Sequence, residues 1–116
     1  MKISERTVGD VTIFDLDGRL ILDEGFEPLR AALSHAIGEG RRNVLLNLAG
    51  VTFLDSAGIG LIACKYVTMH RLSGQLKLCN LRAHSHEVLR TTKLLTVFES
   101  FDDEADALQS FRTPLV

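Results

Sequence analysis

The sequence predicts an α/β domain built on a mixed β-sheet with helices packed on it. The chain has 116 residues, enough for one hydrophobic core. Its apolar residues recur with a period of two in some segments and of three to four in others, which is typical of strands that alternate with helices. An early turn favours an antiparallel hairpin, and the later strand–helix–strand units favour parallel pairing. We therefore expect a single domain over residues 1–116 with the order ββαβαβαβα.

The hairpin is the first element. Gly9 and Asp10 supply the unusual backbone angles of a tight turn between strands at residues 3–8 and 11–16. Gly18 marks a bend after the second strand.

A helix and a central strand follow. Asp23 is the expected N-cap of the helix, which ends near Gly38 and Gly40. Residues 43–48 form a nearly continuous apolar run, which is typical of a strand covered on both faces.

The second half of the chain continues the alternation. We expect a helix from Ser56 to about Leu72, a strand at residues 75–80, a helix at 85–92 and a short strand at 97–98. A terminal helix opens at residues 102–103, where two acidic side chains favour a helix start.

Composition excludes several classes of function. The formal net charge is −2, with 13 basic and 15 acidic residues, so we expect no nucleic-acid partner. No apolar run approaches the roughly 20 residues that a membrane helix needs, and the opening residues do not resemble a signal peptide. Cys64 and Cys79 lack metal-ligand spacing and are expected to be small buried hydrophobes. We therefore expect a cytoplasmic protein with no membrane insertion, metal or cofactor.

The most informative segment is VTFLDSAGIG, residues 51–60, which follows the central strand and opens a helix. In open α/β sheets, ligands and partners meet the protein at this end of a strand. Ser56 is placed to cap the helix, and Gly58 and Gly60 would allow another backbone or a phosphate to approach. A purely structural role, with Ser56 as N-cap and the glycines as packing positions, is the alternative.

Two enzymatic interpretations of this segment agree poorly with the sequence. A dinucleotide or P-loop site needs a third glycine or a Gly-Lys-Ser/Thr sequence, which is missing here. A nucleophile elbow needs glycine two residues before the serine, where this chain has Leu54. None of the four histidines can be placed beside Ser56 from the sequence, so no catalytic residue is expected.

The stretch from Asn47-Leu48 through Asp55-Ser56-Ala57-Gly58-Ile59-Gly60, with the later segment GQLKL at residues 74–78, resembles a STAS domain. It is more narrowly similar to the bacterial anti-sigma-factor antagonists. The resemblance covers nearly the whole chain, and its most specific part is Asp-Ser-x-Gly-Ile/Leu-Gly after a buried strand. It implies a single STAS-like domain.

The resemblance also implies a mechanism. In such antagonists the serine after the aspartate, Ser56 here, is phosphorylated by an anti-sigma factor that is also a serine kinase of the histidine-kinase-like ATPase type. The unphosphorylated form binds that kinase and frees the sigma factor, and a serine phosphatase resets the phosphorylated form. The partner-binding residues would be Asp23, Asp55, Ser56, Ala57, Gly58, Ile59 and Gly60. Such a protein catalyses nothing itself, and a weak homodimer stays open.

The family often has a second hydroxyl residue where this chain has Ala57, and an acidic residue where it has Arg19. Asp23 and Glu24 are candidates to supply that acidity. Two other functions stay open: a STAS-type accessory subunit of a transport or signalling assembly, which binds without phosphorylation, and a small enzyme or nucleotide-binding domain.

Overall fold

The computed structural model describes residues 1–112 and confirms the α/β class and the mixed sheet. The elements are β1 (Lys2–Val8), β2 (Val11–Leu20), α1 (Phe26–Gly38), β3 (Asn43–Leu54), α2 (Ser56–Arg71), β4 (Gln75–Cys79), α3 (Ala83–Thr91), the 3-10 helix η1 (Leu94–Thr96), β5 (Ser100–Phe101) and α4 (Glu104–Arg112). The predicted ββαβαβαβα order is therefore confirmed.

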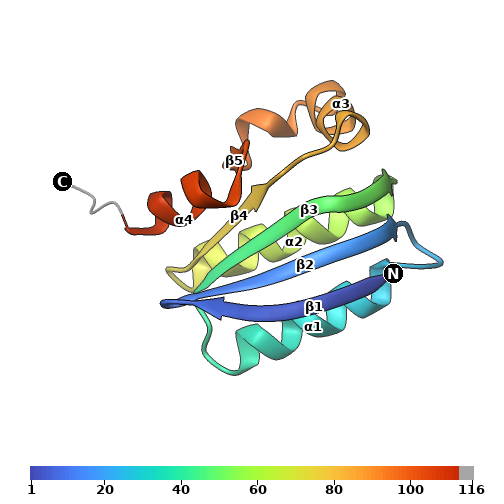
Figure 1. The fold of residues 1–116 in the computed structure, drawn as a ribbon. Coiled ribbons are helices and arrows are strands. Elements are labelled where there is room, and N and C mark those ends of the chain that lie inside the picture. The colour runs from blue at the N-terminus through green and yellow to red at the C-terminus, as the bar shows by residue number, and fades with distance from the viewer. Residues whose placement is uncertain (113–116) are drawn as a thin grey trace.

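The five strands form one sheet in the order β1-β2-β3-β4-β5 (Figure 1). β1 pairs antiparallel with β2, and every later pairing is parallel. The carboxyl ends of β2, β3 and β4 consequently lie along one edge of the sheet, which we call the carboxyl edge. The connections that leave this edge lead into α1, α2 and α3.

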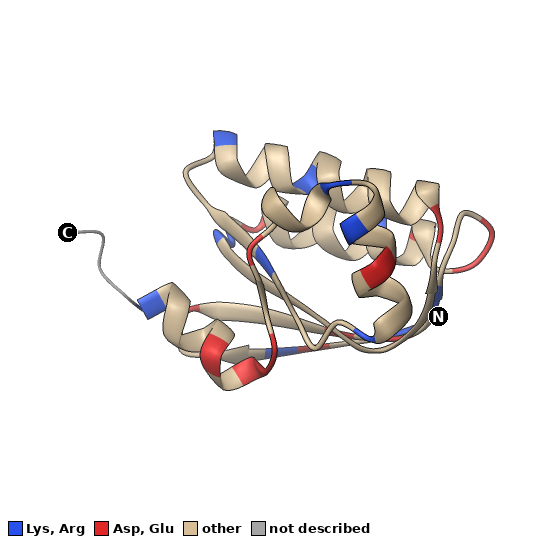
Figure 2. Ribbon diagram, turned by 90° about the horizontal axis from the view of Figure 1, so that it is seen from above, with Lys and Arg blue, Asp and Glu red and all other residues tan. Residues whose placement is uncertain are grey.

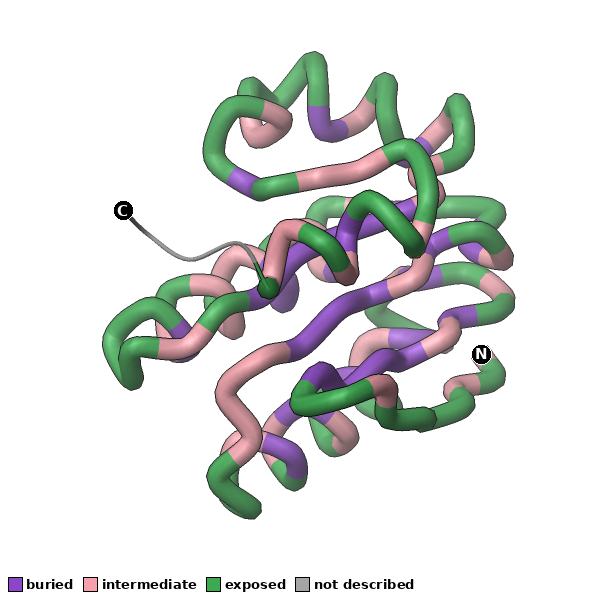
Figure 3. The backbone as a smooth tube through the Cα atoms, turned by 60° about the vertical axis from the view of Figure 1, so that its left-hand side comes forward, coloured by how far each residue is buried: buried purple, intermediate pink, exposed green. Residues whose placement is uncertain are grey.

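One face of the sheet is covered by α1 and α2 (Figure 1). Alternate residues of the central strands, such as Phe14 and Leu46, pack there against Leu33 of α1 and Ile62 of α2. The buried residues of the sheet lie along β2, β3 and β4, whereas β1 has no buried residue (Figure 3). This cluster removes most of the apolar side chains from water, which is the main stabilising contribution to such a fold.

The opposite face is covered only in part, by α4. Ile13 and Leu45, which neighbour the residues named above, point to this face and form a smaller cluster with Ala107 of α4. Lys77 of β4 is buried beneath α4, with 3% of its surface exposed. Its Nζ donates to Ser110 Oγ at 2.9 Å and lies 3.2 Å from a Glu99 carboxylate oxygen.

Several predicted boundaries differ from the structure. The helix expected to begin with Asp23 as N-cap begins at Phe26, because residues 22–25 form turns in which the N–H groups of Glu24, Gly25 and Phe26 bond to the Ile21 carbonyl oxygen. β3 extends six residues beyond Leu48 to Leu54. The strand expected at 97–98 lies instead at Ser100–Phe101.

The longer β3 depends on a bulge. Asp15 of β2 pairs with Asn47, but Asp17 pairs with Gly50, so β3 carries one extra residue there. A Cβ atom on Gly50 would lie 2.6 Å from the Leu16 carbonyl oxygen. The glycine therefore lets the two strands stay paired across the irregularity.

Cys79 is buried as expected, and burial raises its pKa to about 12, whereas Cys64 is exposed, contrary to expectation. Basic and acidic residues are interspersed over several elements (Figure 2). Among the helices within residues 1–112, none combines the length and the apolar character that crossing a membrane requires.

The burial of Lys77 gives a first prediction. Lys77→Met should leave the free energy of unfolding within about 1 kcal/mol of the wild type, because methionine fills the same space and needs no partner. Glu99, with 59% of its side chain exposed, returns to water, and Ser110 Oγ keeps its bond to the Ala107 carbonyl. Lys77→Ala should cost about 2–3 kcal/mol through the cavity it leaves. Urea unfolding of both variants checks this, and equal losses would contradict it.

Candidate functional site

The candidate site lies where β3 ends and α2 begins, at the carboxyl edge of the sheet. Asp55 is the residue that caps α2: its backbone is extended, and its Oδ1 accepts the Gly58 N–H at 2.9 Å. Ser56 is the first residue of the helix and is exposed. The prediction that Ser56 caps the helix is therefore wrong. With Asp55 as the cap, the Ser56 hydroxyl is not needed for that purpose.

Asp55 also fixes the neighbouring connection. Its second carboxylate oxygen accepts the backbone N–H of Leu22, in the β2–α1 connection, at 3.1 Å. Partial burial raises the pKa of Asp55, but the N–H groups of Gly58 and Leu22 outweigh it, so the net pKa lies below its ordinary value. The charged carboxylate thus joins the start of α2 to the end of β2.

The two glycines of the motif have different surroundings. Gly58 is buried, and a Cβ atom there would lie 2.4 Å from the Leu20 carbonyl oxygen and 2.9 Å from Leu20 Cγ. Gly60 is exposed, and a Cβ atom there would meet nothing within 4 Å. Packing within the described fold therefore requires glycine at position 58 and not at position 60.

The remaining predicted partner residues divide into two groups. Asp23 is exposed in the turn beside Leu22, and Ala57 is half-buried in the first turn of α2, so both lie near Ser56 at the carboxyl edge. Ile59 instead packs partly against the main hydrophobic core. Glu24, considered as a source of acidity, is occupied by Arg19, whose Nη2 donates to it at 2.9 Å.

Two exposed apolar side chains at this edge were not predicted as site residues. Leu22 is 61% exposed and Phe53 is 47% exposed. The Phe53 ring stacks on His84 of α3, with the ring centroids 4.4 Å apart and the planes at 24°. An apolar residue beside a motif is ordinarily assigned to the core, so the sequence held no signal for their exposure.

The hydrogen bonds found within residues 1–112 include none between Ser56 and a histidine. The same residues contain no group of three or more His, Cys, Asp or Glu side chains that could hold a metal ion.

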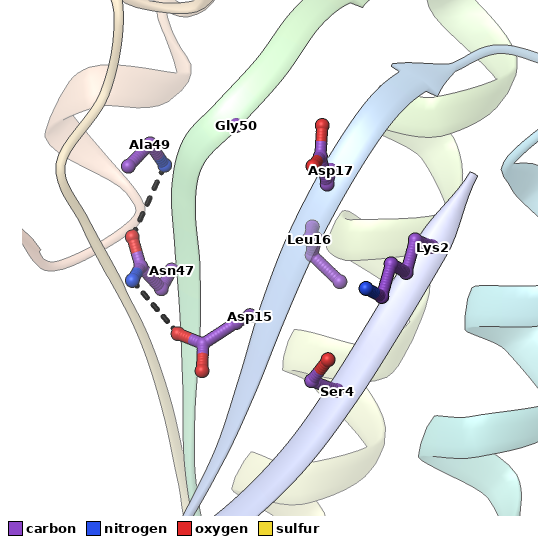
Figure 4. Close-up of a pocket in the computed structure, with 8 residues that line it drawn as sticks. All are labelled: Lys2, Ser4, Asp15, Leu16, Asp17, Asn47, Ala49 and Gly50. Carbon is purple, nitrogen blue, oxygen red and sulfur yellow. Dashed lines mark hydrogen bonds between the residues drawn. The ribbon is translucent and has the colours of Figure 1, made fainter.

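A concave site lies on the face of the sheet that α4 covers only in part. This hollow of about 290 Å³ is bordered mainly by polar side chains of β1, β2 and β3, and Figure 4 shows Asp15 and Asn47 directed toward each other across it. Asn47 Nδ2 donates to Asp15 Oδ1 at 2.8 Å, and its Oδ1 accepts the Ala49 N–H at 3.1 Å. The residues that line the hollow are Lys2, Ser4, Asp15, Leu16, Asp17, Asn47, Ala49 and Gly50.

The Asp15 carboxylate in this hollow is already paired with other side chains of the protein. Arg6 Nε donates to Asp15 at 2.7 Å and its Nη1 to Glu104 of α4 at 3.0 Å. The Arg6 guanidinium holds the pKa of the Asp15 carboxyl below its ordinary value. The network joins β1, β2, β3 and α4 through Arg6, Asp15, Asn47 and Glu104. These four residues therefore have a structural role.

The surroundings of the two glycines predict opposite effects on stability. Gly58→Ala should lower the free energy of unfolding by about 2 kcal/mol, because the added methyl overlaps the Leu20 carbonyl. Gly60→Ala should raise it by up to about 1 kcal/mol, since alanine restricts the unfolded chain and favours the helix. Thermal and urea unfolding measure both changes. Loss of stability in Gly60→Ala would contradict the assignment.

The Asp55 bonds predict a pH dependence. Asp55→Asn keeps one acceptor but presents an N–H₂ group to one of the two backbone N–H donors, and should lower the unfolding free energy by about 1 kcal/mol near pH 7. The folded-state pKa is depressed, so the carboxylate's contribution is complete above its unfolded pKa of about 3.9 and is lost as the pH falls through the folded value. Urea unfolding of the wild type and of Asp55→Asn, from pH 7 to values below about 3.9, checks this pH dependence. A constant difference at every pH would contradict this account.

Comparison with known proteins connects this fold and site to a family. The sequence pattern of the STAS domain matches residues 2–107. BtrV of Bordetella bronchiseptica, which its name assigns to the anti-sigma factor antagonists, is 27% identical over 115 residues, covering 99% of this chain and 98% of BtrV.

Solved structures agree in fold. TM1081 of Thermotoga maritima superposes with a TM-score of 0.90 at 20% identity, covering 96% of this chain and 95% of that one. Unphosphorylated SpoIIAA of Bacillus, an anti-sigma factor antagonist, superposes with a TM-score of 0.75 at 21% identity, covering 97% of this chain and 100% of SpoIIAA. With the motif at the start of α2 and the match over most of the sequence, the chain belongs to the STAS domain family, and its relatives include anti-sigma factor antagonists.

Proposed function

We propose that the protein is an anti-sigma-factor antagonist whose binding to a serine-kinase anti-sigma factor is switched off by phosphorylation of Ser56. The observation that supports it most directly is the exposure of Ser56 at the start of α2, with Asp55 serving as the cap. A hydroxyl that is free of structural duty can be modified without loss of the fold. BtrV, which matches nearly this whole chain, supports the same function.

The local electrostatics suit a phosphate at this position. Phosphorylation adds about −1.5 to −2 charges, and the first turn of a helix favours an anion through its dipole and its N–H groups. The neighbouring Asp55 carboxylate is engaged with Gly58 and Leu22, which reduces the charge that it presents to a phosphate. The domain would therefore keep its fold after modification.

For the kinase, the charge of the surface that it binds would change greatly. A dianion at the centre of an interface must lose its hydration, and unless the partner supplies matching cations this costs several kcal/mol. Every 1.4 kcal/mol corresponds to a tenfold change in affinity, so one phosphate is sufficient to release the kinase. Dephosphorylation by a serine phosphatase would restore the binding surface.

The test is intact mass measurement, with site mapping, after incubation with ATP and a histidine-kinase-like ATPase from the same organism. We expect one added phosphate on Ser56, none on Ser56→Ala, and unchanged phosphorylation of Ser4→Ala, which removes another exposed hydroxyl. Ser56→Asp should bind the kinase at least about tenfold more weakly than the wild type, with amide shifts confined to the neighbourhood of Ser56.

Two results would contradict the proposal. Phosphorylation of Ser56→Ala would place the modification elsewhere. A wild-type protein that binds the ATPase but is never modified would instead favour the second candidate, a STAS-type accessory module that binds constitutively.

A further inference from the structure

We infer that α3 and the 3-10 helix η1 form a lid that opens away from β3 while the rest of the domain stays folded. The lid is the segment from residue 81 to residue 97, which leaves the sheet after β4 and returns to it at β5 (Figure 1). Its opening gives a second state, in which the part of β3 beneath α3 is accessible and Phe53 no longer stacks on His84. The inference goes beyond the proposed function and does not depend on phosphorylation.

Little buried apolar surface attaches α3 to the sheet. Leu89 is fully buried in the main core, whereas Val88 is only partly buried. By comparison, α1 and α2 each bury three apolar side chains in the same core. Because hydrophobic stabilisation scales with the apolar area removed from water, α3 is the least firmly attached of the three helices.

Two buried polar atoms of α3 have no hydrogen-bond partner. They are Ser85 Oγ and His84 Nε2, and within residues 1–112 no other buried side-chain nitrogen or oxygen lacks one. Ser85 is completely buried, so its hydroxyl gains water only when the lid opens. The closed state alone therefore bears the cost of leaving these two atoms unbonded, and the stacking of His84 on Phe53 offsets part of it.

Both ends of α3 lack the features that stabilise a helix end. The N-cap residue, Arg82, provides no side-chain acceptor for the first N–H groups, whereas Asp55 does so for α2. Lys93, the residue after the C-cap Thr92, has a φ of +65°, a left-handed conformation that glycine adopts with less strain. Opening relieves this strain, because the backbone of Lys93 is then free to change.

The lid can open without separating the strands, because its two ends are held together at β4 and β5. The Asn80 N–H, just before the lid, bonds to the Phe101 carbonyl oxygen at 3.1 Å. Phe98, just after the lid, is buried and lies edge-on to Tyr66, with the ring centroids 5.4 Å apart. Opening is therefore a local event between these two fixed points.

Amide hydrogen exchange of the full chain, at several urea concentrations below the unfolding transition, measures the opening. The amides of α3 should exchange at least about tenfold faster than the slowest amides of β3. Their rates should also depend less on urea, because opening the lid exposes less surface than unfolding the domain. If both sets exchange at the same rate and with the same urea dependence, α3 opens only when the whole domain unfolds, and the inference is wrong.

Limited digestion with trypsin gives an independent measurement. Arg30 of α1 and Arg90 of α3 are matched sites, because each is exposed and its Nη2 donates at 2.5 Å to a glutamate three residues earlier, Glu27 or Glu87. Cleavage within a helix requires local opening, so the wild type should be cut after Arg90 at least about tenfold faster than after Arg30. Equal rates at the two sites would contradict the inference.

Two substitutions should favour the closed lid, each with a matched control. Ser85→Ala removes an unpartnered hydroxyl and should slow α3 exchange about tenfold, more than His86→Ala, which makes a similar gain in helix propensity at an exposed position. Lys93→Gly should slow it about threefold or more. Ser73→Gly, at the equivalent left-handed residue after α2, should leave it within about twofold of the wild type.

The controls decide whether the named features govern the lid. If Ser85→Ala slows α3 exchange no more than His86→Ala does, and Lys93→Gly no more than Ser73→Gly does, the inference is wrong.

Discussion

The geometry of the candidate site depends on how closely the start of α2 approaches the end of β2. The buried Gly58 lies so near the Leu20 carbonyl that a Cβ atom would stand 2.4 Å from it. Asp55 then fastens the same two elements by accepting the N–H groups of Gly58 and Leu22. Steric contact fixes the distance and the carboxylate fixes the orientation, so Ser56 and Leu22 have a defined spatial relation.

This constraint would let the proposed phosphorylation of Ser56 alter binding without unfolding the domain. The serine lies on a helix that is buried along its inner face, at Ile62 and Met69, and capped by another side chain. A phosphate there adds charge to a surface whose backbone is already determined. Under the proposed function, the change in free energy would appear in the complex, where the dianion must be desolvated, and much less in the free protein.

The sequence predicted the order of the elements well and their ends less well, for identifiable reasons. Hydrophobic periodicity persists through the middle of each element, and it located β3 and α2. The ends depend on tertiary contacts. Asp23 has the chemistry of a helix cap, but turns bonded to Ile21 delay α1 to Phe26. Ala49-Gly50 has the composition of a turn, yet the pairing of Gly50 with Asp17 lets β3 continue to Leu54.

The cap at the start of α2 could be placed from local sequence, whereas the contact made by Phe53 could not. Asp55 and Ser56 are adjacent residues that both cap helices well, so composition could locate the cap but could not choose between them. Phe53 differs, because its partner His84 belongs to α3 and meets it only through the parallel arrangement of β3 and β4. Periodicity assigns an apolar residue to the core by default. An apolar residue that packs on one side and is exposed on the other can be identified only after the strands are placed side by side.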